Sequence, residues 1–462
     1  MALPSLKINE LPKAPSLKKL MGPSFIILGL GLGSGEIILW PYLASHYGLG
    51  IIWGAVIGIS FQFIMNMEIE RYALINGESI FAGFARKLKA FPIWFILSTF
   101  LPWMWPGIAA SSARLMGAVV GVTETSYLAI GLLIFMGLIL TLGPVLYKTV
   151  ENLQKILIGI GVPSIFILSI LLASKTNWGD LAQGLVGMGK GYWLLPAGLP
   201  IASFLGALAY AGAGGNLNLA QSQYVKEKGY GMGKYAGRIT SLLTGKSENV
   251  TLTGSKFEPT PENVLEFKKW WKNINIEHFV IFWLTGSITI VLLSLLSYAT
   301  TYGTGQNVSD ISFVFGEVKV ISERIFPFAG TFFLIVTSLT LFGTQLTVFD
   351  ATSRIISENI VLASDLKLSE KHLPKVYYSV LWVQIITGVA IMLMGFTQPL
   401  QLITLAAVMN AFAMFVHVGL TLWLNMTTLD KTLKPTAFRI LAMLLAFAFY
   451  GGFSVYTIIT SF

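Results

Sequence analysis

Long apolar stretches, separated by short polar segments, occupy most of the chain. A helix needs about 20 mostly apolar residues to cross a lipid bilayer, and eleven stretches reach that length. The pattern therefore predicts an all-α integral membrane protein with about 11 transmembrane helices. The spans are expected at residues 23–47, 51–75, 92–121, 126–147, 152–174, 192–224, 276–301, 327–355, 375–397, 400–426 and 436–461.

Two of these helices are interrupted at matching places. The first break reads Gly33-Ser34-Gly35-Glu36, in the first span, and the second reads Ala213-Gly214-Gly215-Asn216, in the sixth. Glycine inside a helix is about 1 kcal/mol less favourable than alanine, so each cluster should unwind its helix. In lipid, freed backbone groups are tolerated only where they line protein or a watery cavity.

Paired glycine interruptions in corresponding halves of a membrane protein indicate the substrate site of a secondary transporter. Close helix packing through small residues is the competing interpretation of the first run, and the matching second run weakens it. The substrate-binding residues predicted on this basis are Gly33, Ser34, Gly35, Glu36, Ala213, Gly214, Gly215, Asn216, Asn218 and Tyr210.

The breaks fall in the first and sixth spans, which divides the chain into two five-helix halves and one extra helix. The first span is expected to run in the opposite direction to the sixth, so the halves form inverted repeats. The predicted organisation is a cytoplasmic N-terminal segment, two repeats and a C-terminal helix, at 1–22, 23–174, 192–426 and 436–461.

Basic residues concentrate in alternate connections between spans. Arg86 and Lys89 follow the second span and Lys431 and Lys434 follow the tenth, whereas the connection 121–126 carries no lysine or arginine. Cytoplasmic loops carry an excess of basic residues. We therefore expect a multi-pass protein of the cell membrane, with its N-terminus cytoplasmic and its C-terminus outside.

Residues 226–277 form the one long polar stretch between spans, and we expect a cytoplasmic loop there. It contains the run Lys268-Lys269-Trp270-Trp271-Lys272. One interpretation is an interfacial helix that binds the inner leaflet. The other is a solvated loop with aromatic anchors, because tryptophan favours the interface in any case.

Composition excludes several other functions. Charged residues make up 11% of the chain, against about 25% in soluble domains. The absence of cysteine excludes disulfides and thiolate metal sites. The four histidines lack metal-ligand spacing, and no nucleophile–base pair appears, so neither enzymatic activity nor a cofactor is expected. The net charge is +9, but the basic residues lie beside apolar segments, which argues against nucleic acid as a partner. No pattern requires a partner subunit.

Several stretches resemble the Nramp (natural resistance-associated macrophage protein) divalent-metal transporters. They are Gly22-Pro23 with the break ten residues later, Ala44–Gly48 leading into Trp53, Gly212–Leu217 and Ala113–Gly117. The resemblance covers nearly the whole chain in topology and is strongest in residue identity over 22–77. It implies a LeuT-type fold with an inverted 5+5 repeat, broken first and sixth helices, and alternating access.

The metal site that the resemblance implies is mostly absent. The family's Asp-Pro-Gly-Asn break binds metal through its Asp and Asn, and these positions hold Gly33 and Glu36 here. The family's methionine, proline and histidine in the second break correspond to Ala213, Gly214 and Gly215. Selection of transition metals calls for a soft sulfur ligand, and none aligns. The chain is thus a divergent member by resemblance.

Two hypotheses follow for the substrate. Because small residues replace large ones, we expect an enlarged central cavity that holds a small organic solute, either a zwitterion or an organic cation. Glu36 would pair with its cationic group, and Trp40, Tyr42 and Tyr210 would offer cation–π contacts, although ordinary packing explains each aromatic residue as well. The alternative is a hard divalent cation, magnesium or manganese, bound by Glu36 and backbone carbonyls, whose transport need not be coupled to protons.

Other polar residues within the spans are candidates for coupling or gating: Ser111, Arg114, Asp350 and Asn410. The resemblance places Ser111 and Arg114 where the family's third helix relays protons, which argues against proton coupling along that helix. Arg114 is also a candidate partner for a carboxylate on another helix. The i, i+4 spacing of Asp350 and Arg354 favours a structural salt bridge.

Overall fold

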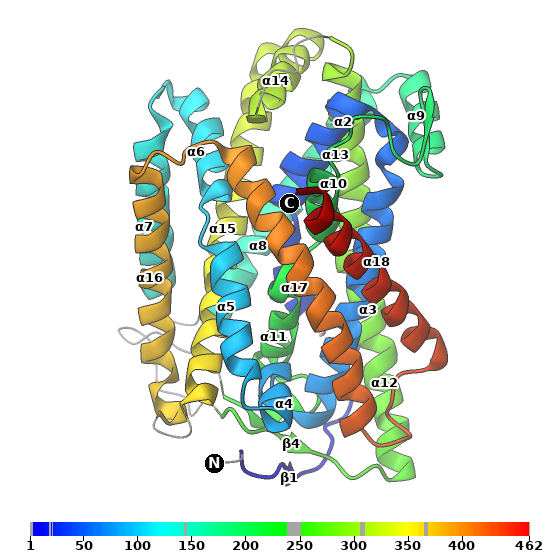
Figure 1. Cartoon of the computed structure of the whole chain (residues 1–462), viewed down its shortest axis with the longest axis vertical. Coiled ribbons are helices and arrows are strands. Elements are labelled where there is room, and N and C mark those ends of the chain that lie inside the picture. Colours follow the sequence, from blue (N-terminus) through cyan, green and yellow to red (C-terminus); the bar gives the residue numbers. More distant parts are fainter. Residues whose placement is uncertain are drawn as a thin grey trace.

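The computed structural model describes residues 3–17, 20, 22–142, 146–237, 251–304, 310–364 and 368–461. In this part of the chain the helices form one elongated bundle (Figure 1). The N-terminus, the β1–β4 pair and α4 lie at one end of the bundle, called the N-terminal end below, and α9 and α14 lie at the opposite end. Residues 238–250 of the predicted loop and residues 1–2, 18–19 and 21 of the predicted N-terminal segment fall outside the described residues.

The first five spans contain ten helical segments. They are α1 (Pro23–Gly31), the π-helix η2 (Ser34–Leu39), α2 (Trp40–Tyr47), η3 (Leu49–Ile51), α3 (Trp53–Asn76), α4 (Ile80–Lys87), α5 (Phe91–Trp103), α6 (Gly107–Val120), α7 (Thr125–Leu142) and α8 (Leu146–Leu172). Helix α9 (Lys175–Gly184) and the hairpin of β2 (Met188–Gly189) with β3 (Tyr192–Trp193) lead to the second half.

The second half begins with the broken sixth span. Its helical segments are α10 (Ile201–Ala209), η4 (Gly215–Ala220), α11 (Gln221–Lys228), η5 (Gly231–Tyr235), α12 (Pro261–His278), η6 (Phe279–Leu284), α13 (Thr285–Thr301), η7 (Asp310–Ser312), α14 (Phe313–Arg324), α15 (Pro327–Ala363), η8 (Glu370–His372), α16 (Leu373–Leu393), α17 (Pro399–Thr428) and α18 (Ala437–Ser461).

Ten helical stretches among the described residues are long and apolar enough to cross a membrane. The sixth predicted span is not among them because it is divided into α10 and α11, which are shorter than a bilayer crossing. The ten long stretches and the divided sixth span together account for the eleven predicted spans. The all-α membrane fold with interrupted first and sixth helices is therefore confirmed.

Two regions contain detail that the sequence analysis did not predict. The third span, predicted over 92–121, is present and is divided into α5 and α6, because Pro106 cannot donate a backbone hydrogen bond and its ring disfavours a helix before it. The second part of the expected loop 226–277 is helical, which agrees with the helical one of its two interpretations. Thr260 caps α12 by accepting from the Asn263 amide at 3.3 Å, and α12 runs on through η6 into α13.

The N-terminal segment is held against this helix and the strand before it. Strand β1 (Lys7–Ile8) pairs in parallel with β4 (Ser255–Lys256). Trp270, from the predicted basic-aromatic run, donates from Nε1 to the carbonyl of Pro12 at 2.6 Å. Its ring is 3% exposed, so this tryptophan packs against protein rather than serving as a free anchor.

Candidate substrate site at the two helix breaks

The two breaks lie against each other, which is what their glycines permit. A Cβ added to Gly31 would stand 3.0 Å from the Gly212 backbone, and one added to Gly35 would overlap the carbonyl of Tyr210. Such close contact between backbones is possible only without side chains. The structure thus brings residues about 180 positions apart into one site.

Side chains from other spans satisfy the backbone groups that the breaks release. The Oγ1 of Thr344, in α15, lies within hydrogen-bond distance of the carbonyls of Gly29 (3.0 Å) and Leu32 (3.2 Å), which share its single proton. Gln62, in α3, donates to the Ala209 carbonyl at 2.9 Å and accepts from the Gly214 amide at 3.3 Å. The breaks are thereby stabilised as the interior of a membrane protein requires.

His417 belongs to the same supporting set. Its Nε2 lies 3.0 Å from the carbonyl of Gly215. The sequence analysis missed Thr344, Gln62 and His417 as members of the site. Their only signal is that each is a polar residue within an apolar span, a signal that many neighbouring serines and threonines share.

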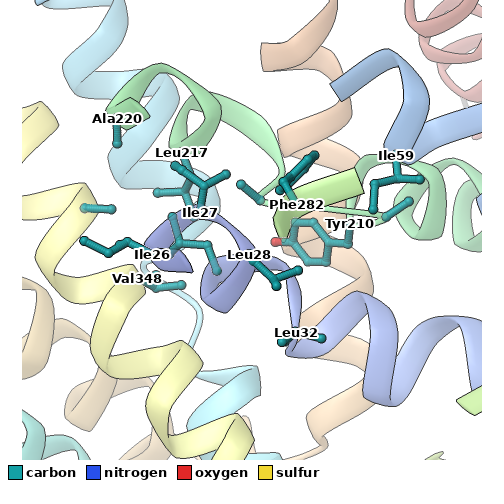
Figure 2. Close-up of a cluster of buried hydrophobic side chains, with 14 of the residues drawn as sticks. Ile26, Ile27, Leu28, Leu32, Ile59, Tyr210, Leu217, Ala220, Phe282 and Val348 are labelled. Carbon is teal, nitrogen blue, oxygen red and sulfur yellow. The ribbon is translucent and has the colours of Figure 1, made fainter. Parts of the chain in front are cut away.

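Glu36 is the exceptional residue of the site. It is 0% exposed, and neither of its carboxylate oxygens has a hydrogen-bond partner among the described residues. Oε1 lies 3.5 Å from the Cβ position of Gly286 in α13, a point that Leu28 and Ile59 also approach. Figure 2 shows these two side chains with Phe282 in the same buried apolar cluster. Glu36 therefore lies in an apolar environment without a counter-charge.

The second break presents a group of amide side chains. Asn216 donates from Nδ2 to Ser98 (2.8 Å) and Thr99 (3.0 Å), and Asn410 donates to the Tyr210 hydroxyl at 2.9 Å. Asn218 donates to the carbonyl of Gly215 at 3.3 Å. The Oδ1 atoms of all three asparagines lack a partner in the described part of the chain. These oxygens remain as acceptors for a ligand.

The expectation that small residues leave an empty centre is wrong at these glycines. The space next to Gly33 is occupied by Thr344, and that next to Gly35 and Gly214 by Tyr210. Asn410 fills the space at Gly215, whose φ of +54° also favours glycine. The physical reason is that the half-helices approach each other until neighbours fill the volume. Ala213 and Ser34 are likewise buried, at 1% and 4% exposure.

The aromatic candidates pack in ordinary ways in this conformation. Tyr210 stacks on Trp103 at 5.4 Å between ring centroids, and Trp40 meets Phe204 edge-on at 5.9 Å. Tyr42 lies against the imidazole of His46 at 4.1 Å, in the same helix. Of these, Tyr210 is directly at the second break.

Of the coupling candidates, Asn410 alone reaches the breaks. Ser111 donates to the carbonyl of Gly107 at 2.9 Å within its own helix. Arg114, 33% exposed, forms an ion pair with Asp310 and a 3.3 Å hydrogen bond to Ser312. The carboxylate partner foreseen for Arg114 thus lies in η7, outside the long helices.

Asp350 belongs to a buried ion-pair cluster nearer the N-terminal end of the bundle. Arg354 donates from Nε to Asp350 at 2.9 Å and also pairs with Glu227 of α11. The hydroxyls of Tyr377 and Tyr224 donate to Asp350 at 2.8 and 3.1 Å. The cluster ties α11, the second half of the broken sixth span, to α15 and α16.

Metal-ligating groups are sparse among the described residues. They contain no group of three or more histidine, aspartate, glutamate or cysteine side chains that could hold a metal ion. Carbonyls near the breaks are already engaged: Gly29 and Leu32 accept from Thr344, and Gly215 accepts from Asn218. The fit to a fully dehydrated cation is therefore poor.

No family model matches the sequence, and no curated protein shows significant similarity to it. Several solved structures, however, are similar to this chain. A mutant of the manganese transporter of Eremococcus coleocola superposes with a TM-score of 0.70 at 14% identity, covering 98% of this chain and 89% of that one.

Two structures with organic ligands are also similar. Mhp1, a nucleobase-cation-symport-1 family transporter with bromovinylhydantoin bound, gives a TM-score of 0.54 at 12% identity and covers 98% of this chain and 96% of its own. MhsT in complex with L-phenylalanine gives a TM-score of 0.55 at 14% identity and covers 96% of this chain and 99% of its own. The chain therefore has the LeuT-type fold of these proteins.

Proposed function

We propose that this chain is an Nramp-like secondary active transporter that works by alternating access and carries a small organic solute with a cationic group. The solute, a zwitterion or an organic cation, would bind between the two helix breaks. The protein would lie in the cell membrane with its N-terminus cytoplasmic and its C-terminus outside, as the distribution of basic residues favours.

The buried carboxylate of Glu36 is the observation that carries this proposal. A carboxylate removed from water without a counter-ion costs several kcal/mol, so the site favours a partner that is not part of the protein. A cationic solute would supply the missing charge. The free amide oxygens of Asn216, Asn218 and Asn410 would accept hydrogen bonds from the same solute.

The volume at the breaks is filled in the described conformation, so the solute would enter another state of the transport cycle. Tyr210 is suited to move, because its ring fills the space beside Gly214 while, among the described residues, its hydroxyl is held by Asn410 alone. A rotation of this ring would open space next to both breaks. Figure 2 shows Tyr210 as a member of the buried cluster that also contains Leu28 and Phe282.

A divalent cation, magnesium or manganese, is the alternative substrate. The structural similarity to a manganese transporter favours it, and Glu36 would be its one carboxylate ligand. Against it stand the apolar side chains around Glu36 and the carbonyls already engaged by Thr344. A hydrated magnesium ion, which keeps several waters, would fit this alternative best.

A thermal-shift screen of the purified protein tests both substrates. Amino acids, betaines, polyamines and divalent ions are added singly, because a ligand that binds only the folded state raises its apparent Tm. We expect an organic cation or zwitterion to raise the Tm and Glu36→Gln to remove that increase without lowering the Tm of the ligand-free protein.

Glu317→Gln is the matched control, since Glu317 is also a buried glutamate (3% exposed) but lies in α14. This variant should keep the ligand response. A response to magnesium or manganese alone, lost in Glu36→Gln, would establish the alternative. A full organic-ligand response in Glu36→Gln would contradict the proposed role of this residue.

A further inference from the structure

A second buried polar cluster, outside the breaks, joins α1 to α12. It consists of Ser24, in the first turn of α1, and Glu277 and His278, at the C-terminal end of α12. Ser24 Oγ lies 2.5 Å from Glu277 Oε2 and 2.8 Å from His278 Nδ1. Exposure is 0%, 6% and 0% for Ser24, Glu277 and His278. We call these three residues the triad.

The shared serine restricts how protons are arranged in the triad. A hydroxyl donates only one hydrogen bond, so Ser24 donates to one neighbour and accepts from the other. If Ser24 donates to an ionised Glu277, His278 must carry a proton on Nδ1. If a protonated Glu277 donates to Ser24, then Ser24 donates to His278, whose proton must be on Nε2.

Counting protons shows what one more proton does. With Glu277 ionised and His278 neutral, the triad carries a net charge of −1. One added proton makes the triad neutral, either as an ion pair with imidazolium or as two uncharged groups. In both products His278 Nε2 becomes a donor, whereas in the charged form it is an acceptor.

The surroundings hold the triad in place. The imidazole of His278 is stacked between Phe282, at 4.7 Å, and Phe63, at 5.6 Å, which limits its rotation. Its Nε2 has no partner among the residues described. The charged and titratable groups that face the triad from other elements are Glu70 of α3, Tyr147 and Glu151 of α8, Lys228 of α11, and Tyr230.

These neighbours do not neutralise the triad. Lys228 is bonded to Glu151 at 3.0 Å, and Glu151 also accepts from Lys155 at 2.6 Å. Glu70 accepts a hydrogen bond from Gln221 at 3.2 Å. Lys228 is the cation of this group that acts on Glu277, and it is shared with Glu151. Within the triad, Ser24 links the carboxylate of Glu277 to the imidazole of His278, so a proton added to the triad can reside on either group.

We propose that the triad is a binding site for one proton, and that its occupancy changes the attachment of α1 to α12. Since α1 ends at the first break, this would couple a proton to the half-helix next to the substrate site. The coupling role rests on the proposed transport function. The proton site itself does not.

Nuclear magnetic resonance of the full chain, labelled with ¹⁵N-histidine, tests the proton site directly. Four histidines are present, and His278→Gln assigns the signal of interest. If that variant fails to fold, Gln substitutions at His46, His372 and His417 assign it by elimination. We expect His278 to change its protonation state or its tautomer in a single step as the triad takes up its proton.

Glu277→Gln is expected to move this step down by about one pH unit or more, because a nearby carboxylate favours the imidazolium. If the proton instead resides on Glu277, His278 changes from the Nδ1–H to the Nε2–H tautomer at the same pH. A carboxylic acid band that Glu277→Gln removes then appears in the infrared spectrum. Either result supports the site.

Controls use matched residues outside the triad. Glu262→Gln, at an exposed position of α12, should leave the His278 titration unchanged. Ser24→Ala should release the fixed tautomer, whereas Ser294→Ala, at another fully buried serine, should not. A His278 that keeps one protonation state and tautomer throughout, without a Glu277 band, would overturn the proposal.

Hydrogen exchange tests the attachment of α1. After correction for the intrinsic dependence of exchange on pH, protection of residues 23–31 should change across the His278 step in the wild type and not in Glu277→Gln. Equal protection on both sides of the step would refute the link to α1. These measurements need no substrate. If the triad titrates but no compound raises the Tm in the thermal screen, only the proposed function is contradicted. If a compound raises the Tm but the triad does not titrate, only the triad proposal is contradicted.

Discussion

Glycine acts through contact at some positions of this chain and through flexibility alone at others. At Gly35 an added Cβ would overlap the Tyr210 carbonyl, whereas at Gly131, in the middle of α7, it would meet nothing within 4 Å. The same substitution should therefore have opposite effects at the two sites.

Gly35→Ala is predicted to lower the free energy of unfolding by about 2 kcal/mol or more, because overpacking forces backbones apart. Gly131→Ala should stabilise the protein by up to about 1 kcal/mol, since alanine is the better helix former. Chemical denaturation in detergent measures both. Equal effects of the two variants would mean that the breaks are not closely packed.

At the scale of single residues, the sequence pattern identified Glu36 but not the residues around it. An acidic residue inside an apolar span is conspicuous, so Glu36 was a candidate at once. That both of its oxygens lack a partner depends on which side chains the neighbouring spans place nearby. Gly286, Leu28 and Ile59 are not conspicuous in the sequence.

At the scale of helices, buried charges hold α11 against α15. Arg354 of α15 lies between Asp350 and Glu227 at 1% exposure, and its guanidinium group lies 5.4 Å from the ring of Tyr224. A buried ion cluster loses more when one member is removed than when all are replaced, because the remaining charges stay unpaired.

Arg354→Met should consequently destabilise the protein by about 3–5 kcal/mol. Combining it with Asp350→Asn and Glu227→Gln should restore much of the loss. Arg324→Gln, at the exposed end of α14, is the control and should change stability little. Thermal unfolding of the wild type and the three variants measures this, and a triple variant less stable than Arg354→Met would refute the interpretation.

Local sequence pattern predicted a contact within one helix but not a contact between helices. The i, i+4 spacing of Asp350 and Arg354 predicted their salt bridge, which the structure contains, since both residues lie on one helix. Glu227 was not foreseen as the third member, because it is 127 positions from Arg354. Similarly, the third span contains two prolines, Pro102 inside α5 and Pro106 just before α6. Whether a proline only bends a helix or divides it depends on packing.

For the whole molecule, the proposed orientation in the membrane rests on the distribution of basic residues and can be measured. The chain contains no cysteine, so single cysteines report accessibility without further engineering. Lys87→Cys, at the C-terminal end of α4, and Lys175→Cys, in α9, are both exposed and lie toward opposite ends of the bundle (Figure 1).

A membrane-impermeant maleimide added to intact cells should label Lys175→Cys and leave Lys87→Cys unlabelled until the membrane is permeabilised. The control is Lys319→Cys in α14, which should behave like Lys175→Cys because both helices lie at the end opposite α4. The reverse labelling pattern would invert the proposed topology.

The sequence by itself determined the membrane class, the positions of the spans and the two breaks. These depend on apolar length and on glycine clusters, which are properties of neighbouring residues. Only the tertiary structure decided which groups complete the site. Thr344 reaches Gly29 across 315 positions, Ser24 reaches Glu277 across 253, and Gln62 reaches Ala209 across 147. Such contacts depend on how separate helices pack. For the same reason, only the tertiary structure shows that Glu36 has no hydrogen-bond partner among the described residues.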